Sequence, residues 1–390
     1  MISNIRVGIP ILGSKGWIAG ISFTESLIKA MYSLPENERP QFFLVVSDYN
    51  LKTFNLHQSF IPLFNGVIFQ GYNLKTARTT INSSFIHCSS QDELFTKIDL
   101  FFPVNSLVMP GRPAVPWIPD FQNRYLPDFF SLQECEYRNA RFAEIAKQAQ
   151  LIIFNTQSVE KDFWNFYPNS KAITDVLAPP FFPEDKWYLG NPREVQQKYQ
   201  LPDSFVLCSN QFWIHKNHSV LFKAIALLRQ AGQPVHVVCT GSTNDYRWPD
   251  HFANLQQYIR QIGISDIVHI LGLIPREDQI QLIRRSLFVI QPSLFEGFSM
   301  IVQECQELGK QIVLSDLDVH LEYAYGIYFE RTNSHDLCQK ILNLLSVVQP
   351  GPDLRKESTA KANTATKVKY FAEKFCKFIE KSQRIFHKTT

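Results

Sequence analysis

Short apolar runs alternate with loops and amphipathic stretches along most of the chain. Apolar runs of strand length occur at Arg6–Pro10 and Phe42–Val46, and a helical pattern over Ile21–Leu34 lies between them. A further run at Ala149–Asn155 is followed by a helical pattern near Ser158–Phe166. Such an alternation of strands and helices predicts parallel sheets covered by helices.

A proline-rich segment divides this pattern in two. Pro179–Pro183 contains three prolines in five residues, and such a segment continues neither a helix nor a central strand. The alternation then restarts, with predicted strands at 205–209, 235–240, 268–272, 287–291 and 311–315 and predicted helices at 218–230 and 299–308. We therefore predict two α/β domains, residues 1–180 and 190–350, joined by a hinge that implies a cleft between them.

Residues 353–390 form a third, basic segment. It carries ten lysines and arginines against four acids, and Phe371, Phe375 and Phe378 recur on one helical face. We interpret it as a terminal helix that packs this face on the body of the protein. The alternative is a basic amphipathic helix that contacts an anionic membrane, in which case the protein would be peripheral on the inner face of the membrane.

Composition narrows the class of protein. A chain of 390 residues suits two domains, and 45% hydrophobic with 19% charged residues is typical of a globular protein. The net charge of +3 is too small to indicate nucleic acid by itself. The seven cysteines contain no Cys-x-x-Cys pair, which argues against a disulfide framework or a zinc ribbon. With no signal-peptide pattern and no run near ~18 apolar residues, we expect a cytoplasmic protein.

The strongest chemical signal lies between Gln291 and Glu304. Glu296 is in the loop that leaves a predicted strand, Gly297 lets the backbone approach a ligand, and Glu304 is on the following helix. The start of that helix offers unpaired N–H groups to a diphosphate, and the two carboxylates can accept hydrogen bonds from sugar hydroxyls. The alternative is that both glutamates are merely exposed at a helix end.

A second signal follows the predicted strand 205–209. Lys216 is expected at the carboxyl edge of the sheet, where ligands bind in open α/β sheets. A lysine there can neutralise the charge that develops on a departing nucleotide phosphate, although it could also be a solvated surface lysine. Gly241, after the strand 235–240, is a third element at the same edge.

Other segments are less specific. Gly13–Gly20 is a glycine-rich turn that matches neither a P-loop nor G-x-G-x-x-G, and it could be only a tight connection. Val115–Phe130 is aromatic, proline-rich and acidic, which suits sugar stacking but also an ordinary buried loop. His215 and His218 lack further ligands, and the Asp-x-Asp at Asp316 matches easily by chance, so we expect no metal.

These residues resemble glycosyltransferase family 4, a group of retaining transferases with the GT-B fold. The family pattern P-S-x-x-E-G-F, followed by a second glutamate eight positions after the first, is here Pro292-Ser293, Glu296–Phe298 and Glu304. The similarity is specific over roughly residues 205–335 and looser over 1–180. There, Trp17–Gly20 and Trp117–Phe130 look like one bacterial branch that includes transferases for surface polysaccharides.

The resemblance implies two Rossmann-like domains facing each other across a cleft, with the C-terminal helix crossing back to the N-terminal domain. It implies that Glu296 contacts the donor sugar, Glu304 the ribose and Lys216 the diphosphate, while Gly16–Gly20 approaches the phosphates. The implied reaction moves a hexose-type sugar from a nucleotide-sugar donor, such as a UDP- or GDP-sugar, to a glycan or lipid-linked acceptor. Anomeric configuration is retained, and neither a metal nor another cofactor is needed.

The chain also departs from the family pattern. Asn210 stands where arginine is common, Ala19 replaces one of two glycines, and Asn123 replaces a histidine expected in some members. Asp120 is therefore our candidate for an acceptor-side base. The expected catalytic residues are Lys216, Glu296 and Asp120, and the expected donor-binding residues are Gly16, Gly20, Asn210, Gly241, Gly297, Phe298, Ser299 and Glu304. Two alternatives remain: a nucleotide-sugar epimerase of similar architecture and a two-lobed solute-binding protein.

Overall fold

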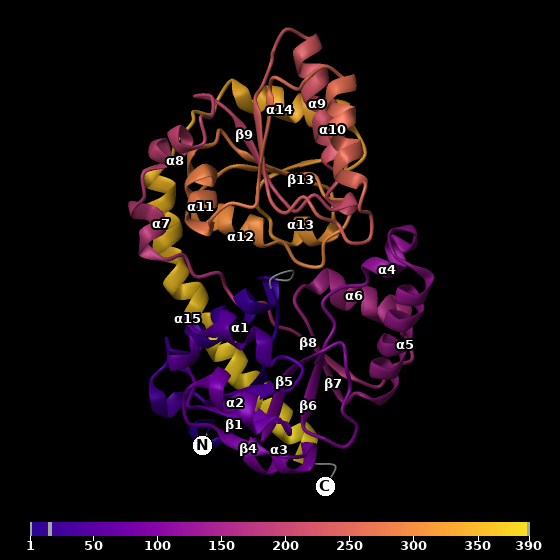
Figure 1. Cartoon of the computed structure of the whole chain (residues 1–390), viewed down its shortest axis with the longest axis vertical. Helices are drawn as coiled ribbons and strands as arrows, with labels where there is room; N and C mark the ends of the chain where they lie inside the picture. Colours follow the sequence, from indigo (N-terminus) through magenta and orange to yellow (C-terminus); the bar gives the residue numbers. More distant parts are fainter. Residues whose placement is uncertain (1, 15–17, 388–390) are drawn as a thin grey trace. The chain divides into compact units, whose positions relative to one another are not determined.

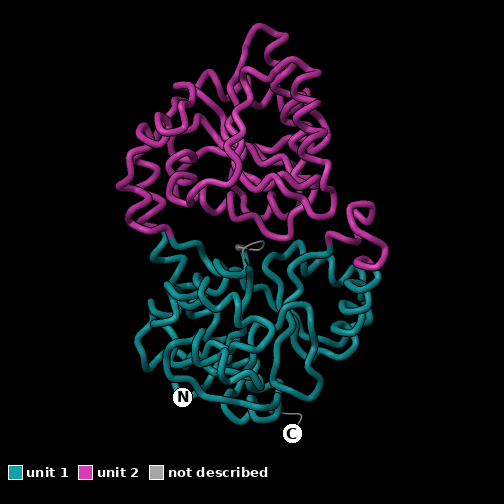
Figure 2. The backbone as a smooth tube through the Cα atoms, in the orientation of Figure 1, with its two compact units in different colours: residues 1–121, 136–182, 364–390 teal, residues 122–135, 183–363 magenta. Residues whose placement is uncertain are grey.

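The computed structural model describes residues 2–14 and 18–387, and the chain divides into two compact units. Unit 1 comprises Met1–Phe121, Glu136–Phe182 and Thr364–Thr390, and unit 2 comprises Gln122–Cys135 and Pro183–Asn363 (Figure 2). Two segments therefore differ from the division expected from the sequence. Residues 122–135 belong to unit 2, and the basic C-terminal segment is shared between the units.

Within the described residues, the strands of unit 1 form one eight-stranded parallel sheet in the order β4-β3-β2-β1-β5-β6-β7-β8. Figure 1 labels β1 and β4 to β8 of this sheet. Its strands are β1 (Arg6–Pro10), β2 (Gln41–Ser47), β3 (Gly66–Gln70), β4 (Ile86–Cys88), β5 (Leu100–Asn105), β6 (Ala114–Trp117), β7 (Leu151–Phe154) and β8 (Ile173–Val176). Its helices are α1 (Ile18–Met31), α2 (Leu74–Ile81), α3 (Gln91–Lys97), most of α5 (Leu132–Gln148), and α6 (Gln157–Phe166). Because helices cover such a sheet, a strand with a neighbour on each side, such as β7, is buried along its whole length and reads as an apolar run.

The C-terminal helix α15 (Leu354–His387) completes the core of unit 1. Phe371, Phe375 and Phe378 are buried in the same hydrophobic cluster as the strand residues Phe42 and Phe102. The ring of Phe375 lies 5.1 Å from that of Phe102 and 6.3 Å from that of Phe42, measured between centroids. The phenylalanine face therefore packs on the body of the protein, and the prediction that this helix returns to the N-terminal domain is confirmed.

In the described part of unit 2, six parallel strands follow the order β11-β10-β9-β12-β13-β14. They are β9 (Val206–Ser209), β10 (Val237–Thr240), β11 (Val268–Gly272), β12 (Val289–Gln291), β13 (Ile312–Ser315) and β14 (Ile327–Phe329). The helices are α4 (Gln122–Tyr125), α7 (Asp185–Leu189), α8 (Pro192–Lys198), α9 (His218–Gln230), α10 (His251–Gln261), α11 (Arg276–Arg285), α12 (Met300–Glu307), α13 (Asp318–Glu322) and α14 (Ser334–Leu345). From β9 the chain builds outward through β10 and β11, then returns to β12 on the other side of β9. This reversal is a topological switch point, where open α/β sheets bind ligands.

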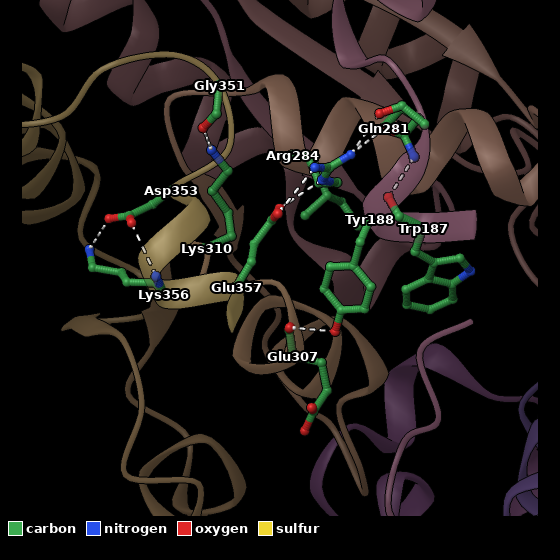
Figure 3. Close-up of polar contacts among 12 residues, drawn as sticks. Trp187, Tyr188, Gln281, Arg284, Glu307, Lys310, Gly351, Asp353, Lys356 and Glu357 are labelled. Atoms are coloured by element: carbon green, nitrogen blue, oxygen red, sulfur yellow. Dashed lines mark hydrogen bonds and ion pairs between the residues drawn. The ribbon is translucent and has the colours of Figure 1, made fainter. Parts of the chain in front are cut away.

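A buried ion pair anchors the start of α15 on α11 of unit 2 (Figure 3). Arg284 and Glu357 have side chains 3% and 5% exposed, and their two bonds, Nε–Oε1 and Nη2–Oε2, measure 2.7 and 3.1 Å. Arg284 also donates to the carbonyl of Gly190, just beyond α7, at 2.9 Å. The nearby ammonium of Lys310 donates to the carbonyls of Ser286 at 2.6 Å and Gly351 at 2.9 Å. Through Arg284, the start of α15 and the segment after α7 are both held on α11.

Across residues 2–14 and 18–387, none of the helices combines the length and the apolar character needed to cross a membrane.

Candidate active site

The site begins at the carboxyl ends of β9 and β12, the neighbouring strands at the switch point of unit 2. Lys216 lies in a short 3₁₀ turn after β9, and Glu296 lies in the loop between β12 and α12. The ammonium Nζ of Lys216 is 2.6 Å from Oε1 of Glu296, and the two side chains are 16% and 8% exposed. The structure thus brings together two residues that the sequence assigned separately to this edge.

The carboxylate of Glu296 is held by further donors from its own loop. Its Oε1 also accepts from Nε2 of Gln291 at 2.7 Å and from Oγ of Ser293 at 2.6 Å. The hydroxyl of Ser315, at the end of β13, donates to the carbonyl of Ser293 at 2.6 Å. Three strands therefore fix the orientation of this carboxylate before any ligand binds. The sequence analysis missed Gln291 and Ser293, although both lie within the motif itself.

The loop that carries Lys216 is held by hydrogen bonds to the loop that follows β10. The buried carboxylate of Asp245 accepts from the backbone N–H of Ile214 at 3.2 Å, and the indole of Trp213 donates to the carbonyl of Asn244 at 3.2 Å. On the other side, the N–H of Leu294 donates to the carbonyl of His215 at 2.8 Å. The lysine therefore projects from a loop that is held on both sides.

Arg247 is a second buried cation beside this loop. Its guanidinium lies 4.7 Å from the ring of Trp213 and 4.8 Å from that of Phe130, and Nη2 is 3.3 Å from Nδ1 of His215. Burial, together with the charges of Lys216 and Arg247, lowers the pKa of His215 well below its usual value. The imidazole is therefore neutral near pH 7, so its Nδ1 can accept the hydrogen bond from Arg247.

Glu304 lies on α12 and is almost fully buried, with its side chain 3% exposed. Its Oε1 accepts from Nη2 of Arg276, the first residue of α11, at 2.7 Å. Its Oε2 is buried and makes no hydrogen bond within the described residues, and the same holds for Oγ of Ser299 and Oε1 of Gln291. Buried polar atoms are normally satisfied, so unsatisfied ones on neighbouring segments indicate a site that a ligand completes.

At the start of α12, the expected phosphate seat, one N–H group already has a partner. The backbone N–H of Ser299, the residue before the helix, already donates to the hydroxyl of Tyr323 at 3.1 Å. Burial raises the pKa of the Tyr323 hydroxyl, which therefore stays neutral. Phe298 lies beside it, with a centroid separation of 6.2 Å, and Gly297 precedes it in the loop. The sequence contained no local signal for this contact, because Tyr323 follows a different strand.

Gly241 and Asn210 meet at the ends of β10 and β9. Gly241 has φ +133°, and a Cβ atom there would lie 2.1 Å from the carbonyl oxygen of Asn210. Glycine is therefore required by a close backbone approach between neighbouring strands. Asn210 is 7% exposed, and its amide contacts the sulfur of Cys208 at 3.6 Å, so its side chain is engaged within the sheet.

The remaining candidates lie in unit 1. Asp120 follows β6, and its Oδ1 is 3.3 Å from Nη1 of Arg138. Gly20 is buried in α1, where its carbonyl accepts from the hydroxyl of Thr24 at 3.2 Å. Gly16 lies outside the described residues.

The described residues contain no group of three or more histidines, cysteines, aspartates or glutamates arranged to hold a metal ion. Asp316, the first residue of the Asp-x-Asp pattern, instead pairs with Nε of Arg331 at 2.8 Å. Its Oδ1 also accepts from the backbone N–H of Arg331 at 3.1 Å. This aspartate therefore connects the ends of β13 and β14.

Comparison with known proteins finds a family model that matches part of unit 2. Residues 193–359 match the family model described as Glycosyl transferases group 1. The matched segment contains the Lys216–Glu296 pair, Glu304 and Arg276. The similarity to glycosyltransferases thus lies in the part of unit 2 that carries the candidate site.

Curated relatives agree at low identity. The chain is 26% identical over 212 residues to a D-inositol 3-phosphate glycosyltransferase of Corynebacterium jeikeium, covering 51% of this chain and 50% of the relative. It is 22% identical over 188 residues to the protein of the same name from Corynebacterium aurimucosum, covering 46% and 44%. The chain thus spans about half the length of the curated relatives it matches.

Solved structures match over almost the whole chain. Anabaena Alr3699/HepE in complex with UDP and glucose has a TM-score of 0.63 at 17% identity, covering 97% of this chain and 100% of the other. A trehalose-6-phosphate structure from E. coli, bound with UDP-2-fluoro glucose, has a TM-score of 0.61 at 11% identity, covering 97% and 99%. These are GT-B structures, and the predicted fold class of two Rossmann-like α/β domains is confirmed.

Proposed function

We propose that this chain is a retaining glycosyltransferase of family 4 that transfers a hexose-type sugar from a nucleotide-sugar donor. The observation that carries the proposal is the Lys216–Glu296 ion pair at the switch point of unit 2. Glu304 lies on α12, the helix that follows the loop of Glu296, and one of its carboxylate oxygens is buried and unsatisfied within the described residues. A preorganised cation and two carboxylates suit a ligand that carries both phosphates and hydroxyl groups.

Each residue has a distinct role in this proposal. Glu296 accepts hydrogen bonds from the donor sugar, Glu304 from the ribose, and Lys216 neutralises the diphosphate as the sugar departs. An ammonium group has three donors, so Lys216 can keep its bond to Glu296 while it donates to a phosphate oxygen. Electrostatic stabilisation of the leaving phosphate lowers the barrier to transfer. Asp120, from unit 1, is the proposed acceptor-side base.

The relatives support the donor class. The Anabaena structure holds UDP and glucose, and the E. coli structure holds UDP-2-fluoro glucose, so UDP-sugars are the first donors to test. For the acceptor we propose a glycan or a lipid-linked glycan, in the biosynthesis of a surface polysaccharide. We place the reaction in the cytoplasm, with peripheral contact to the inner face of the membrane through exposed lysines of α15, such as Lys369 and Lys377.

A thermal-shift screen of UDP, GDP, ADP and their sugars tests the donor class. A ligand present at about 100 times its dissociation constant should add about 2.7 kcal/mol to the free energy of unfolding. Product analysis by NMR, with and without oligosaccharide acceptors, then tests the reaction. Transfer with retained anomeric configuration is expected. Isomerised donor in the absence of any acceptor would favour the epimerase instead, and sugar binding without turnover would favour a solute-binding protein.

We also propose that transfer requires no metal ion or other cofactor. The cationic side chain Lys216 would neutralise the leaving diphosphate, a task that a divalent ion performs in other transferases. The rate of transfer should therefore be unchanged by EDTA. Activity that chelator abolishes and added Mn²⁺ restores would contradict this part of the proposal.

A further inference from the structure

The orientation of Glu304 depends on one side chain from a different helix. Arg276 begins α11, directly after Pro275, and its Nη2 donates to Oε1 of Glu304 at 2.7 Å. The side chain of Arg276 is 37% exposed, whereas that of Glu304 is 3% exposed. The arginine therefore lies at the surface edge of the site, and it donates a hydrogen bond to this buried carboxylate.

Arg276 is itself held from two sides. Its Nη1 donates to Oε1 of Gln279 at 2.9 Å, and its guanidinium lies 5.0 Å from the ring centroid of Trp187. Nε2 of Gln279 donates to the hydroxyl of Ser209 at 2.6 Å, and that hydroxyl lies 2.9 Å from the hydroxyl of Thr240. A continuous hydrogen-bonded chain thus leads from Glu304 to the carboxyl ends of β9 and β10. The planar guanidinium, with its fixed fork of donors, can hold such a geometry.

This arrangement leaves the two oxygens of Glu304 in different states. Oε1 is engaged by Arg276, while Oε2 is buried without a hydrogen-bond partner in the described part of the chain. A buried acceptor without a hydrogen bond costs free energy, and a ligand hydroxyl is a donor that would satisfy it. If the carboxylate rotated, Oε2 would no longer be presented to the ligand.

We propose that Arg276 is a positioning residue, which orients Glu304 so that its free oxygen accepts from the vicinal hydroxyls of the ribose in a nucleotide donor. This inference rests on the proposed function, because it presumes a nucleoside diphosphate ligand. Arg276 acts through Glu304 and does not bind the diphosphate. Preference for a nucleotide that carries both ribose hydroxyls therefore depends on Arg276 as strongly as on Glu304.

A competing role for Arg276 is to supply the positive charge that Asn210 lacks, by binding the diphosphate directly. Its contacts point to positioning, because Nη1 donates to Gln279 and Nη2 donates to Glu304. A guanidinium has five N–H donors, so these two bonds leave the choice between the roles to the experiment. The two roles predict different losses. A phosphate contact contributes equally to nucleotides with and without ribose hydroxyls, whereas positioning of Glu304 contributes only to those that have them.

Isothermal titration of the full chain with UDP and 2′,3′-dideoxy-UDP separates these roles, with the GDP and ADP pairs run in parallel. The variants are Arg276→Ala, Arg276→Lys, Glu304→Gln and the double variant Arg276→Ala/Glu304→Gln. Arg229→Ala is the matched control, because Arg229 also pairs with a carboxylate, Asp266, and is 41% exposed. It lies in the last turn of α9, away from the carboxyl edge of the sheet. Thermal unfolding of each variant checks that it is folded.

The wild-type chain should bind UDP about 10- to 100-fold more tightly than the dideoxy analogue. Arg276→Ala and Glu304→Gln should each remove most of this preference, the double variant should lose little more than either, and Arg276→Lys should recover part of it. Arg229→Ala should keep it. The inference is overturned if Arg276→Ala still prefers UDP over the dideoxy analogue as strongly as the wild-type chain does. It is also overturned if Arg276→Ala loses the same factor of affinity for both nucleotides. If the wild-type chain binds none of the three nucleotides, the proposed function fails, and the inference with it.

Discussion

The ammonium of Lys216 and the carboxylate of Glu296 are 2.6 Å apart, although 80 residues separate them in the chain. They meet because β9 and β12 are neighbours in the sheet, so the loops that follow these strands leave the same edge. Both side chains are largely buried, at 16% and 8% exposed. In such surroundings a fixed charge interacts more strongly with a ligand than it would in water.

Removing either member of this pair should therefore reduce transfer far more than it reduces stability. We expect Glu296→Gln and Lys216→Ala each to lower kcat by about 10²-fold or more, because one preorganised contact to developing charge typically contributes about 3 kcal/mol. Initial rates with the donor identified by thermal shift provide the measurement. Circular dichroism and thermal unfolding confirm that the variants are folded.

The matched control for this prediction is Lys340→Ala. Lys340 also pairs with a carboxylate, Asp336, at 3.6 Å, but on the surface of α14. Its removal should leave kcat within about twofold of the wild-type value, because exposed pairs contribute little. Near-normal activity in both Lys216→Ala and Glu296→Gln would show that the active site has been assigned to the wrong residues.

Gly241→Ala should destabilise unit 2, because the added methyl group would clash with the neighbouring backbone and the backbone angle there is unfavourable for alanine. A methyl group there would lie 2.1 Å from the carbonyl oxygen of Asn210, and φ is +133°, a region that other residues rarely adopt. We expect a loss of about 3 kcal/mol or more in the free energy of unfolding, measured by urea denaturation. Gly263→Ala is the control, since Gly263 has φ +69° with no atom near the added methyl, and it should lose only about 1 kcal/mol. Equal losses in the two variants would rule out the steric explanation.

The sequence predicted β1, β2 and β7 of unit 1 and β9 to β13 of unit 2, but not β3 to β6, β8 or β14. A strand covered by helices on both faces is an uninterrupted apolar run, so β7 (Leu151–Phe154) was recognisable from its apolar residues alone. The phenylalanine face of α15 was equally recognisable, because three large apolar side chains at helical spacing require a partner surface.

The side-chain contacts of the candidate site could not be predicted in the same way. Which loops meet depends on strand order, and periodicity does not encode strand order. The bonds from Arg276 to Glu304 and from Ser299 to Tyr323 each join segments that follow different strands. The placement of residues 122–135 in unit 2 is of the same kind, because it depends on contacts such as that between Tyr125 and Phe295, whose ring centroids are 5.6 Å apart.

Removing one partner of the buried Arg284–Glu357 pair should destabilise the protein much more than replacing both partners. Both side chains are at most 5% exposed. Arg284→Met or Glu357→Met should therefore lower the free energy of unfolding by about 3–5 kcal/mol, because an uncompensated buried charge is left behind. The double variant Arg284→Met/Glu357→Met should lose much less than the sum of the single losses.

Lys356→Ala is the control for this pair, because Lys356 is 64% exposed and lies 3.5 Å from Asp353 in the same region (Figure 3). Its loss should change the free energy of unfolding by less than about 1 kcal/mol. Denaturation in urea measures all four variants. If the double variant loses as much as the two single variants together, the partners act independently, and the argument from an uncompensated charge fails.

Lys310 should make stability depend on pH in the mildly alkaline range. Burial lowers the pKa of its ammonium to about 8, below the value of about 10.4 that an exposed lysine has in the unfolded chain. Between these two values the unfolded state binds more protons than the folded state, so the contribution of Lys310 to stability increases as the pH rises. Below about pH 8 both states are protonated and the contribution is constant.

Lys310→Met tests this directly, because it removes the titrating group while filling a similar volume. From pH 8 to pH 9.5, the free energy of unfolding of the wild-type chain should rise relative to that of Lys310→Met by up to about 1.4 kcal/mol per pH unit. Urea denaturation at half-unit intervals provides the measurement. Other groups that titrate in this range, such as tyrosines, affect both proteins equally, so they cancel in the difference. Parallel curves for the two proteins would mean that the Lys310 ammonium titrates as an exposed lysine does, and that its burial among the carbonyls of Ser286 and Gly351 does not penalise its charge.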